Sequence, residues 1–195
     1  MFKFSEFSDK AKEKAISDYR SDDLGYEWWD GVYMWAEEAA NLLGIDLDKR
    51  KNRPYPAIYF SGFCSQGDGA CFEGDYRYRK GSYKEIVEHY PNERELHRIA
   101  KGLQEIQRKQ FYKLVATVQQ SGRYYDMAID VEHSENRYQD IGESEENIKE
   151  RLRDFAHWIY NKLEEEYDYL TSDATIAETL EVNDYLFDEF GNWAG

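Results

Sequence analysis

The sequence predicts an α+β fold in which two β-hairpins form a mainly antiparallel sheet of about four strands, with helices packed on one face. Segments with apolar residues at helical spacing flank two stretches in which apolar and polar residues alternate, as they do in strands. Glycine-containing turns divide each alternating stretch into two strands. Because 195 residues is a usual length for one domain and no linker interrupts them, we expect a single α+β domain over residues 1–195.

Helical spacing and capping residues place the expected helices. The longest begins at Ser144, whose hydroxyl suits a helix N-terminus, and Asn92 and Ser172 are expected to cap two others. A further helix begins at about Tyr26 and carries Trp35 on its apolar stripe. The expected helices cover residues 8–20, 26–43, 82–89, 92–106, 144–170 and 172–180.

Two hairpins are expected to supply the strands. The first turns at Cys64–Gly69, and Gly62 and Gly74 are candidate bulges. The second turns at residues 121–123, and the polar residues that alternate along it indicate one solvated face. The expected strands cover residues 57–63 and 70–78 in the first hairpin and residues 111–119 and 125–131 in the second.

Composition excludes several classes of protein. Aromatic residues make up 16% of the chain, more than a disordered acidic chain carries. No stretch approaches the roughly 20 apolar residues of a membrane span, and no apolar run near Met1 has the pattern of a signal peptide. Two cysteines are too few for a secreted disulfide framework. We therefore expect a cytoplasmic protein of the bacterial host cell, with free thiols and no membrane partner.

The formal net charge of −15 belongs mostly to the C-terminal part of the chain. Residues 140–195 hold 16 acids and 4 bases, whereas residues 1–139 hold 24 acids and 21 bases. A segment this acidic repels phosphate backbones, so we expect no direct nucleic-acid binding. Its carboxylates either form a solvated, solubilising face or bind a basic partner, as a DNA-mimicking surface would. The candidate partner-binding residues are Glu164, Glu165, Glu166, Asp168, Glu178, Glu181 and Asp184.

The glycine-rich turn of the first hairpin is a second candidate site. Its glycines allow backbone N–H groups to turn toward a ligand. The polar residues beside them are Ser61, Ser65, Gln66 and Asp68. The segment lacks the Gly-Lys-Ser/Thr ending of a phosphate-binding loop and leads into no helix. It is either a ligand loop or a turn whose glycines serve backbone geometry alone.

No catalytic set emerges from the sequence. A cysteine nucleophile needs a nearby histidine, and no residue pattern places one beside Cys64 or Cys71, of which Cys71 is expected in the core. Alternation puts Asp126, Asp130 and Glu132 on one face of their strand and His133 on the other, which argues against a metal site. We expect a non-enzymatic protein with no catalytic residues, no metal and no cofactor.

Several aromatic residues fall off the apolar stripes or beside charged residues, where Tyr and Trp commonly anchor protein interfaces. They are Trp29, Tyr33, Tyr78, Tyr124, Trp158, Tyr160, Tyr169 and Trp193. A domain this rich in aromatic residues must expose some of them in any case, so interface use and plain exposure both stay open.

Five segments carry a likeness to a known family: Phe2–Ala15, Tyr26–Trp29, Tyr59–Ala70, Tyr167–Asp173 and the ending Asn183-x-Tyr185-x-Phe187. Through them the chain resembles, over nearly its whole length, a family of small phage and prophage proteins often labelled antitoxin of a toxin-antitoxin stability system. The resemblance implies a protein that neutralises another by binding it, and it carries over no catalytic residues. Cys64 stands where the usual family pattern has an aromatic residue, which weakens the idea of an essential ligand contact there.

The preferred hypothesis is a non-enzymatic, phage-encoded inhibitor that binds and neutralises a host toxin or an antiviral-defence protein, for example a CRISPR effector. Its partner would be a host protein with a basic or nucleic-acid-binding surface. The alternative is a protein that binds or hydrolyses a nucleotide-like small molecule in the hairpin loop from Ser61 to Gly69. A third hypothesis is an accessory protein whose fold simply needs these residues.

Overall fold

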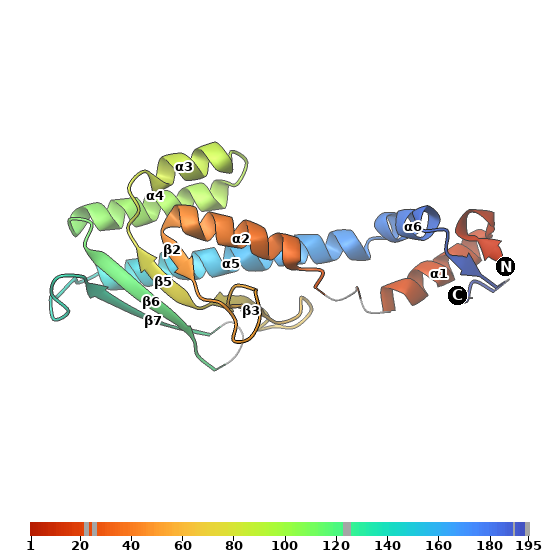
Figure 1. Cartoon of the computed structure of the whole chain (residues 1–195), viewed down its shortest axis with the longest axis horizontal. Helices are drawn as coiled ribbons and strands as arrows, with labels where there is room; N and C mark the ends of the chain where they lie inside the picture. The colour runs from red at the N-terminus through yellow and green to blue at the C-terminus, as the bar shows by residue number, and fades with distance from the viewer. Residues whose placement is uncertain (22–23, 25–26, 123–125, 189, 194–195) are drawn as a thin grey trace. The chain divides into compact units, whose positions relative to one another are not determined.

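The computed structural model describes residues 1–21, 24, 27–122, 126–188 and 190–193 (Figure 1). Helices and antiparallel sheets make up the structure, which confirms the predicted α+β class. Contacts divide the chain into two compact units, a central unit (Asp30–Leu163) and a terminal unit (Met1–Trp29 with Glu164–Gly195). The single domain over residues 1–195 stays a prediction. In the described part of the chain, no helix combines the length and the apolar character needed to cross a bilayer.

In its described residues the central unit contains three complete helices, the first part of a fourth, and six strands. The helices are α2 (Asp30–Leu43), α3 (Ser82–His89), α4 (Arg94–Lys109) and α5 (Ser144–Thr171). The strands are β2 (Ile45–Leu47), β3 (Ile58–Phe60), β4 (Ala70–Phe72), β5 (Gly74–Arg77), β6 (Leu114–Gln120) and β7 (Met127–His133).

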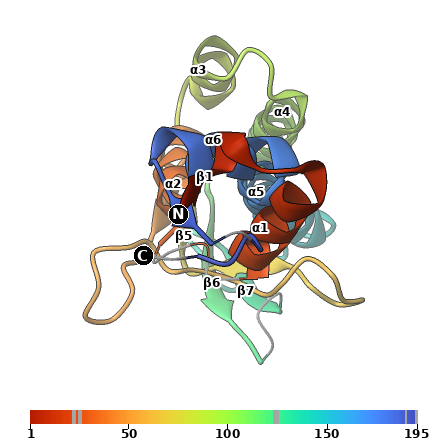
Figure 2. The same ribbon diagram turned by 90° about the vertical axis from the view of Figure 1, so that its right-hand side faces the viewer.

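An antiparallel sheet in the order β2-β5-β6-β7 is the frame of the central unit. Strands β6 and β7 form the second expected hairpin, with Leu114 opposite His133 and Gln120 opposite Met127. Burial alternates along β6 and β7, so one face of the sheet is covered and the other is open to solvent. The helices of this unit lie on the covered side, as Figures 1 and 2 show from two directions.

The first expected hairpin is only partly correct. Strands β3 and β4 pair with each other in a separate two-stranded sheet, whereas β5 joins the four-stranded sheet. The expected strand over residues 70–78 is interrupted at Glu73, because Gly74 has a φ of 155° and lies against β2. A Cβ at Gly74 would be 2.2 Å from the carbonyl oxygen of Asp46, so only glycine fits there. The sheet takes its fourth strand from β2, whose three residues are too few to show alternation.

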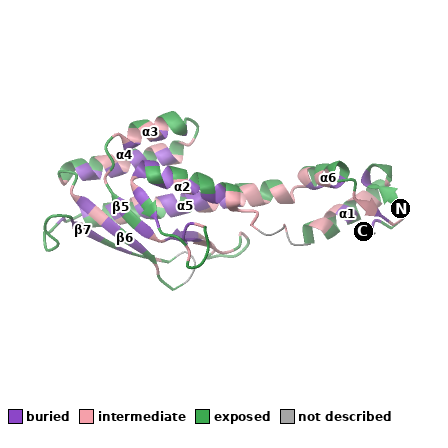
Figure 3. Ribbon diagram, viewed as in Figure 1, coloured by how far each residue is buried: buried purple, intermediate pink, exposed green. Residues whose placement is uncertain are grey.

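Helix α5 supplies much of the core of the central unit. Its expected apolar stripe is buried, and Leu152, Phe155 and Ile159 are fully inaccessible to solvent. The ring of Phe155 packs edge-on against that of Phe72 in β4, with 5.6 Å between ring centroids. Burying a side chain of this kind contributes roughly 1.5–3 kcal/mol relative to exposure. Figure 3 shows buried residues along this part of α5 and along the strands of the sheet.

Two aromatic residues expected at the surface are buried instead. Tyr33 and Trp158 are each 2% exposed. The Tyr33 hydroxyl donates to the carbonyl oxygen of Ile58 at 3.1 Å, and the Trp158 indole N–H donates to the carboxylate of Glu93 at 2.9 Å. Their polar atoms therefore have partners that no periodicity in the sequence reveals. Trp35, which was expected on the buried stripe of α2, is 54% exposed.

The remaining aromatic candidates divide into exposed and partly buried residues. Tyr169 and Trp193 are exposed, and Trp29, Tyr78 and Tyr160 are partly buried. Tyr124 lies outside the described residues, as does Tyr26, at which α2 was expected to begin. Interface use of the exposed residues stays a prediction.

Glu93 joins α4 to α5. It occupies the N-cap position that was expected for Asn92, and its carboxylate accepts hydrogen bonds from the Trp158 indole N–H and from Lys162 Nζ, each at 2.9 Å. Burial opposes ionisation of Glu93, but the two hydrogen bonds and the charge of Lys162 outweigh it, so the pKa of Glu93 lies below its ordinary value of 4.5. Glu93 therefore binds as a carboxylate at neutral pH.

The terminal unit joins chain segments from both sides of the central unit. Its elements are β1 (Phe2–Lys3), the 3-10 helix η1 (Phe4–Glu6), α1 (Asp9–Ser21), the end of α5, α6 (Asp173–Val182) and β8 (Leu186–Phe187). Strands β1 and β8 pair antiparallel, with Phe2 opposite Phe187.

A small apolar core holds the terminal unit together. It consists of Phe4, Ala15, Ile176, Leu180 and Phe187. As the sequence predicts, Ser172 caps α6: its hydroxyl accepts a hydrogen bond from the backbone N–H of Thr175 at 3.2 Å.

The Glu93 carboxylate gives a prediction for pH-dependent stability. We expect Glu93→Gln to lower the free energy of unfolding by about 1–3 kcal/mol at neutral pH, because the charged acceptor of Lys162 is lost. A carboxyl group whose folded pKa is depressed stabilises above its unfolded pKa, and this contribution disappears as the pH falls through the folded pKa. Urea unfolding at neutral and at acidic pH should therefore show a difference between variant and wild type that shrinks with acidification. A difference that is independent of pH would contradict the charge-based role.

Candidate functional site

The hairpin loop between β3 and β4 binds its own backbone. The Ser61 hydroxyl accepts a hydrogen bond from the Gly69 N–H at 3.0 Å, and the Ser61 N–H donates to the Gly69 carbonyl oxygen at 3.0 Å. One oxygen of the Asp68 carboxylate accepts from the N–H groups of Ser65, at 2.7 Å, and Cys64, at 3.1 Å. The side chains of Ser61 and Asp68 therefore stabilise a tight turn by accepting hydrogen bonds from its backbone.

The same loop is attached to α5 by aromatic contacts. The Phe63 ring lies 5.4 Å from that of Tyr160, and the Tyr160 hydroxyl donates to the carbonyl oxygen of Gly62 at 3.1 Å. Ser65 and Gln66 stay exposed at the tip of the loop. A ligand role for Ser61, Ser65, Gln66 and Asp68 stays a prediction.

The two cysteines have different surroundings. Cys71 in β4 is fully buried, as expected, and Cys64 is exposed in the loop. Burial raises the pKa of the Cys71 thiol to about 12, and the charge of Glu73 adds to this effect. Cys71 is therefore a protonated core residue at neutral pH, and it lacks the thiolate that nucleophilic catalysis requires.

The structure contains a cluster around Arg50 that the sequence does not predict. The Arg50 guanidinium lies 4.7 Å from the centroid of the Tyr59 ring and donates to the carbonyl oxygen of Ile58 and, at 3.3 Å, to the Tyr33 hydroxyl. Its Nε is buried without a hydrogen-bond partner, and burial raises the pKa of Tyr33 to about 12. Among the described residues Arg50 has no carboxylate partner, so it acts as a cation packed between aromatic rings. Nothing in its sequence surroundings marks this role.

No metal centre is found among the residues that the structure describes, because no group of three or more His, Cys, Asp or Glu side chains is placed to hold an ion. On β7, Asp130 and Glu132 lie toward the open face, and His133 is buried on the other side. This confirms the expected alternation on this strand, and the absence of a bound metal stays a prediction.

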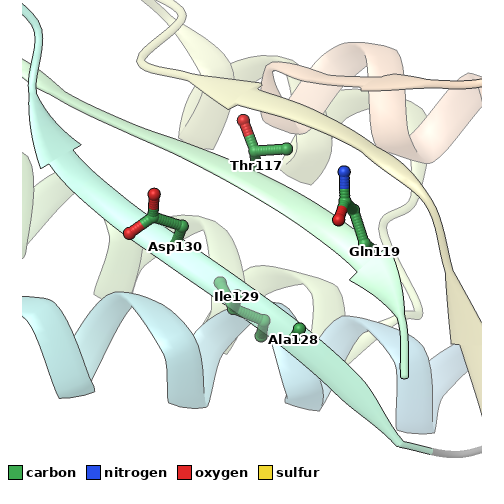
Figure 4. A pocket seen from close by; sticks show the side chains of 5 residues that line it. All are labelled: Thr117, Gln119, Ala128, Ile129 and Asp130. Carbon is green, nitrogen blue, oxygen red and sulfur yellow. The ribbon is translucent and has the colours of Figure 1, made fainter. Parts of the chain in front are cut away.

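A shallow hollow lies on the open face of the sheet (Figure 4). It has a volume of about 330 Å³ and is lined by Thr117, Gln119, Ala128, Ile129 and Asp130. Thr117 is opposite Asp130 in the register, and its hydroxyl donates to the Asp75 carboxylate at 2.8 Å. The hollow is wide open to solvent and mostly lined by exposed polar residues, unlike the enclosed, largely apolar pockets that bind small molecules.

The sequence-predicted acidic residues lie at the end of α5, on α6 and, for Asp184, just after α6, all in the terminal unit. Residues 164–195 contain ten acidic residues and no Lys, Arg or His. On α6, Ile176 and Leu180 face the core, whereas Glu178 and Glu181 are exposed. On α5, Glu164 and Asp168 are one turn apart and share a side, while Glu165 and Glu166 point elsewhere around the helix.

Few of these carboxylates are neutralised within the described part of the chain. Asp184 pairs with Lys3 at 2.7 Å, and Asp173 pairs with Arg20. Glu165 also has an interaction partner. Of the seven candidate residues, those without an ion pair to any described residue are Glu164, Glu166, Asp168, Glu178 and Glu181.

The position of these acids is electrostatically unfavourable for the helices that carry them. The C-terminal end of a helix has a partial negative charge, so basic residues are stabilising there and acidic residues are not. The last turns of α5 and α6 contain no basic residue, but they do contain Asp168 and Glu181. Each such placement is unfavourable by about 0.3–1 kcal/mol. Stability of the fold therefore does not account for this charge.

A second hollow, of about 190 Å³, lies within the acidic region. It is lined by Lys3, Phe4, Ser5, Leu180, Glu181, Asp184 and Tyr185. The ammonium group of Lys3 already binds Asp184 at its rim, in an exposed ion pair that contributes little to stability. Glu181 is the other carboxylate that lines the hollow.

A region of opposite charge lies at the turn between α4 and β6. Arg108 and Lys109 end α4, where they complement the helix dipole, and Phe111 and Tyr112 follow with φ angles of 53° and 63°. A left-handed conformation is unfavourable by roughly 1–2 kcal/mol for residues other than glycine. Phe111 is 82% exposed, so burial of its ring does not offset this strain.

The comparisons with known proteins give one match. A family described as a domain of unknown function, DUF8835, matches residues 28–173. The chain belongs to DUF8835. No curated protein and no solved structure matches the chain.

The DUF8835 match includes all of the central unit and the acidic end of α5. Most of α6 and the strands β1 and β8 lie outside it. The family description names no activity.

The two thiols give a direct test of the loop geometry. In the native protein at neutral pH we expect a maleimide reagent to label one cysteine, Cys64, because Cys71 is buried and its pKa is raised to about 12. Mass spectrometry of peptides identifies the labelled residue, and unfolding in urea should expose both. Equal labelling of Cys64 and Cys71 in the native protein would contradict the burial of β4.

Proposed function

We propose that this DUF8835 protein is a non-enzymatic inhibitor that binds a host protein through the acidic residues at the end of α5 and on α6. The partner class is a toxin or an antiviral-defence protein, for example a CRISPR effector, with a basic or nucleic-acid-binding surface. The resemblance to phage antitoxin-like proteins motivates the phage and host context, and the charge of residues 164–195 motivates the kind of partner.

One observation carries this proposal: unpaired carboxylates stand at helix C-termini, where they destabilise their own helices. Asp168 and Glu181 have no ion-pair partner among the described residues and no basic neighbour in their helical turns. Acidic residues that only kept the protein soluble would be as effective at positions where they do not oppose a helix dipole. A basic partner would supply the missing counter-charge on binding.

The charges of these acidic residues would also attract a basic partner before the two proteins touch. A surface of one sign raises the rate of encounter with an oppositely charged partner, and added salt screens this attraction. Exposed rim charges change the association rate more than the dissociation rate. Binding by this surface should therefore be fastest at low salt.

The alternative, a nucleotide-like ligand in the hairpin loop, has no comparable support. Ser61 and Asp68, its main polar groups, already bind the loop backbone. No basic residue lies between Ser61 and Gly69 to accompany a phosphate.

Charge reversal in α6 separates a binding role from a solubilising one. We expect Glu178→Lys combined with Glu181→Lys to leave the fold unchanged or to stabilise it by up to about 1 kcal/mol, because lysine suits a helix C-terminus. The same variant should associate with the partner roughly tenfold more slowly. The partner is first captured from a bacterial lysate at low salt with wild-type protein and identified, and association is then measured with purified components.

A matched control carries the same charge change in the central unit. Glu88→Lys with Glu105→Lys replaces two exposed acids on α3 and α4, of which only Glu88 has a weak ion pair, 3.6 Å from Lys84. We expect this control to associate as fast as wild type. If the α6 variant and the control behave alike, or if the association rate does not depend on salt, the acidic surface is not the binding site.

A further inference from the structure

We propose that the end of the central sheet beside the turn between α4 and β6 binds single-stranded nucleic acid. We call this surface the basic aromatic end; it consists of Tyr78, Lys80, Arg108, Lys109, Phe111 and Tyr112. It lies in the central unit and is independent of the acidic surface on which the proposed function rests. Figure 1 shows the turn between α4 and β6 at the left of the view.

Two stretches of the chain without acidic residues contribute to this surface. Residues 76–84 contain four basic residues, three tyrosines and no Asp or Glu. Residues 107–113 contain three basic residues and no Asp or Glu, although acids make up 40 of the 195 residues. The rings of Tyr78 and Tyr112 join the two stretches, with 4.5 Å between their centroids and 35° between their planes.

The aromatic side chains are held at the surface by an unusual backbone. Phe111 and Tyr112 are 82% and 43% exposed, and both have left-handed φ angles. Strain of this kind concentrates at functional sites, where the surrounding structure holds a residue in a conformation that it would not adopt alone. The last turn of α4 and the start of β6 hold this pair: the Tyr112 N–H donates to the Gln107 carbonyl oxygen at 2.7 Å.

The basic side chains around these rings are available to a ligand. Lys80, Arg108 and Lys109 are exposed and form no ion pair with any residue that the structure describes. Lys113 and Arg79, by contrast, bind Glu135 and Glu85. Three free cations therefore accompany three partly or fully exposed rings.

Exposed aromatic rings beside unpaired cations suit the bases and phosphates of a single-stranded nucleic acid. Unpaired bases stack on aromatic side chains, and the phosphates between them pair with Lys and Arg. A duplex keeps its base faces covered, so it would gain only the phosphate contacts. The acidity of residues 140–195 predicts no nucleic-acid binding, but salt screens charges beyond about 8 Å at physiological ionic strength. The charge close to the bound strand therefore determines whether this surface attracts or repels its phosphates.

Fluorescence anisotropy with the full-length protein tests this inference. The probe is a labelled oligo-dT of about 20 nucleotides, longer than the roughly 4–16 nucleotides that such surfaces cover. We expect binding that weakens as salt is raised, and weaker binding of a duplex of the same length. No salt-dependent binding of the single strand, or equal binding of the duplex, would overturn the proposal.

Paired variants locate the binding surface. Phe111→Gly removes a stacking ring and suits the left-handed backbone, so the turn should keep its conformation while affinity falls about tenfold. Its control is Phe190→Gly, which removes a 66% exposed ring in the terminal unit. If both glycine variants bind as wild type does, the rings do not stack on the strand and the proposal fails.

A second pair tests the charges. Arg108→Gln with Lys109→Gln should also lower affinity about tenfold and reduce the salt dependence. The control, Lys10→Gln with Lys51→Gln, makes the same charge change at exposed residues without ion pairs among the described residues, and it should bind normally. Competition by poly-glutamate as effective as that by unlabelled oligo-dT would indicate a docking site for an acidic protein and would overturn the proposal.

Discussion

The central unit depends on covering one face of a sheet whose other face stays in water. Val118 and Val131 on the covered face are buried, and Thr117 and Asp130 on the other face are exposed. On the covered side, α5 contributes a stripe of fully buried side chains. Burial of such side chains is the main favourable term in folding, so the polar positions on the open face are free to vary without loss of the core.

Polar atoms inside this core explain why some residues contradict their sequence pattern. Helical periodicity treats Tyr and Trp as residues that fill apolar stripes, and it cannot see a hydrogen-bond partner on another element. Tyr33 is buried because the Ile58 carbonyl oxygen accepts from its hydroxyl, and Trp158 is buried because Glu93 accepts from its indole N–H. The Arg50 cluster could not be predicted for the same reason, because it forms only when the connection between β2 and β3 packs against α2.

Long, regular elements could be predicted from the sequence, and features that depend on close approach could not. The pattern around β6 and β7 predicts their pairing and their buried side, and Ser172 marks the start of α6. The division between β4 and β5 depends on the contact of Gly74 with Asp46, two residues far apart in the sequence. Among the candidate sites, the positions of the acidic residues could be predicted, but their ion pairs with Lys3 and Arg20 could not. The basic aromatic end is visible in the sequence only as two stretches without acids, and only folding brings Tyr78 to Tyr112.

The make-up of the terminal unit has a consequence for the order of events during synthesis. Phe4 and Ala15 leave the ribosome early, but their core partners Ile176, Leu180 and Phe187 are made only after the whole central unit. The central unit is continuous in sequence and can begin to fold while translation proceeds, because domains generally fold as they emerge. The first segment of the chain must therefore wait, with its apolar side chains unprotected, until β8 arrives to pair with β1. Because its two halves lie on either side of the central unit in the sequence, the terminal unit is the last part of the protein to assemble.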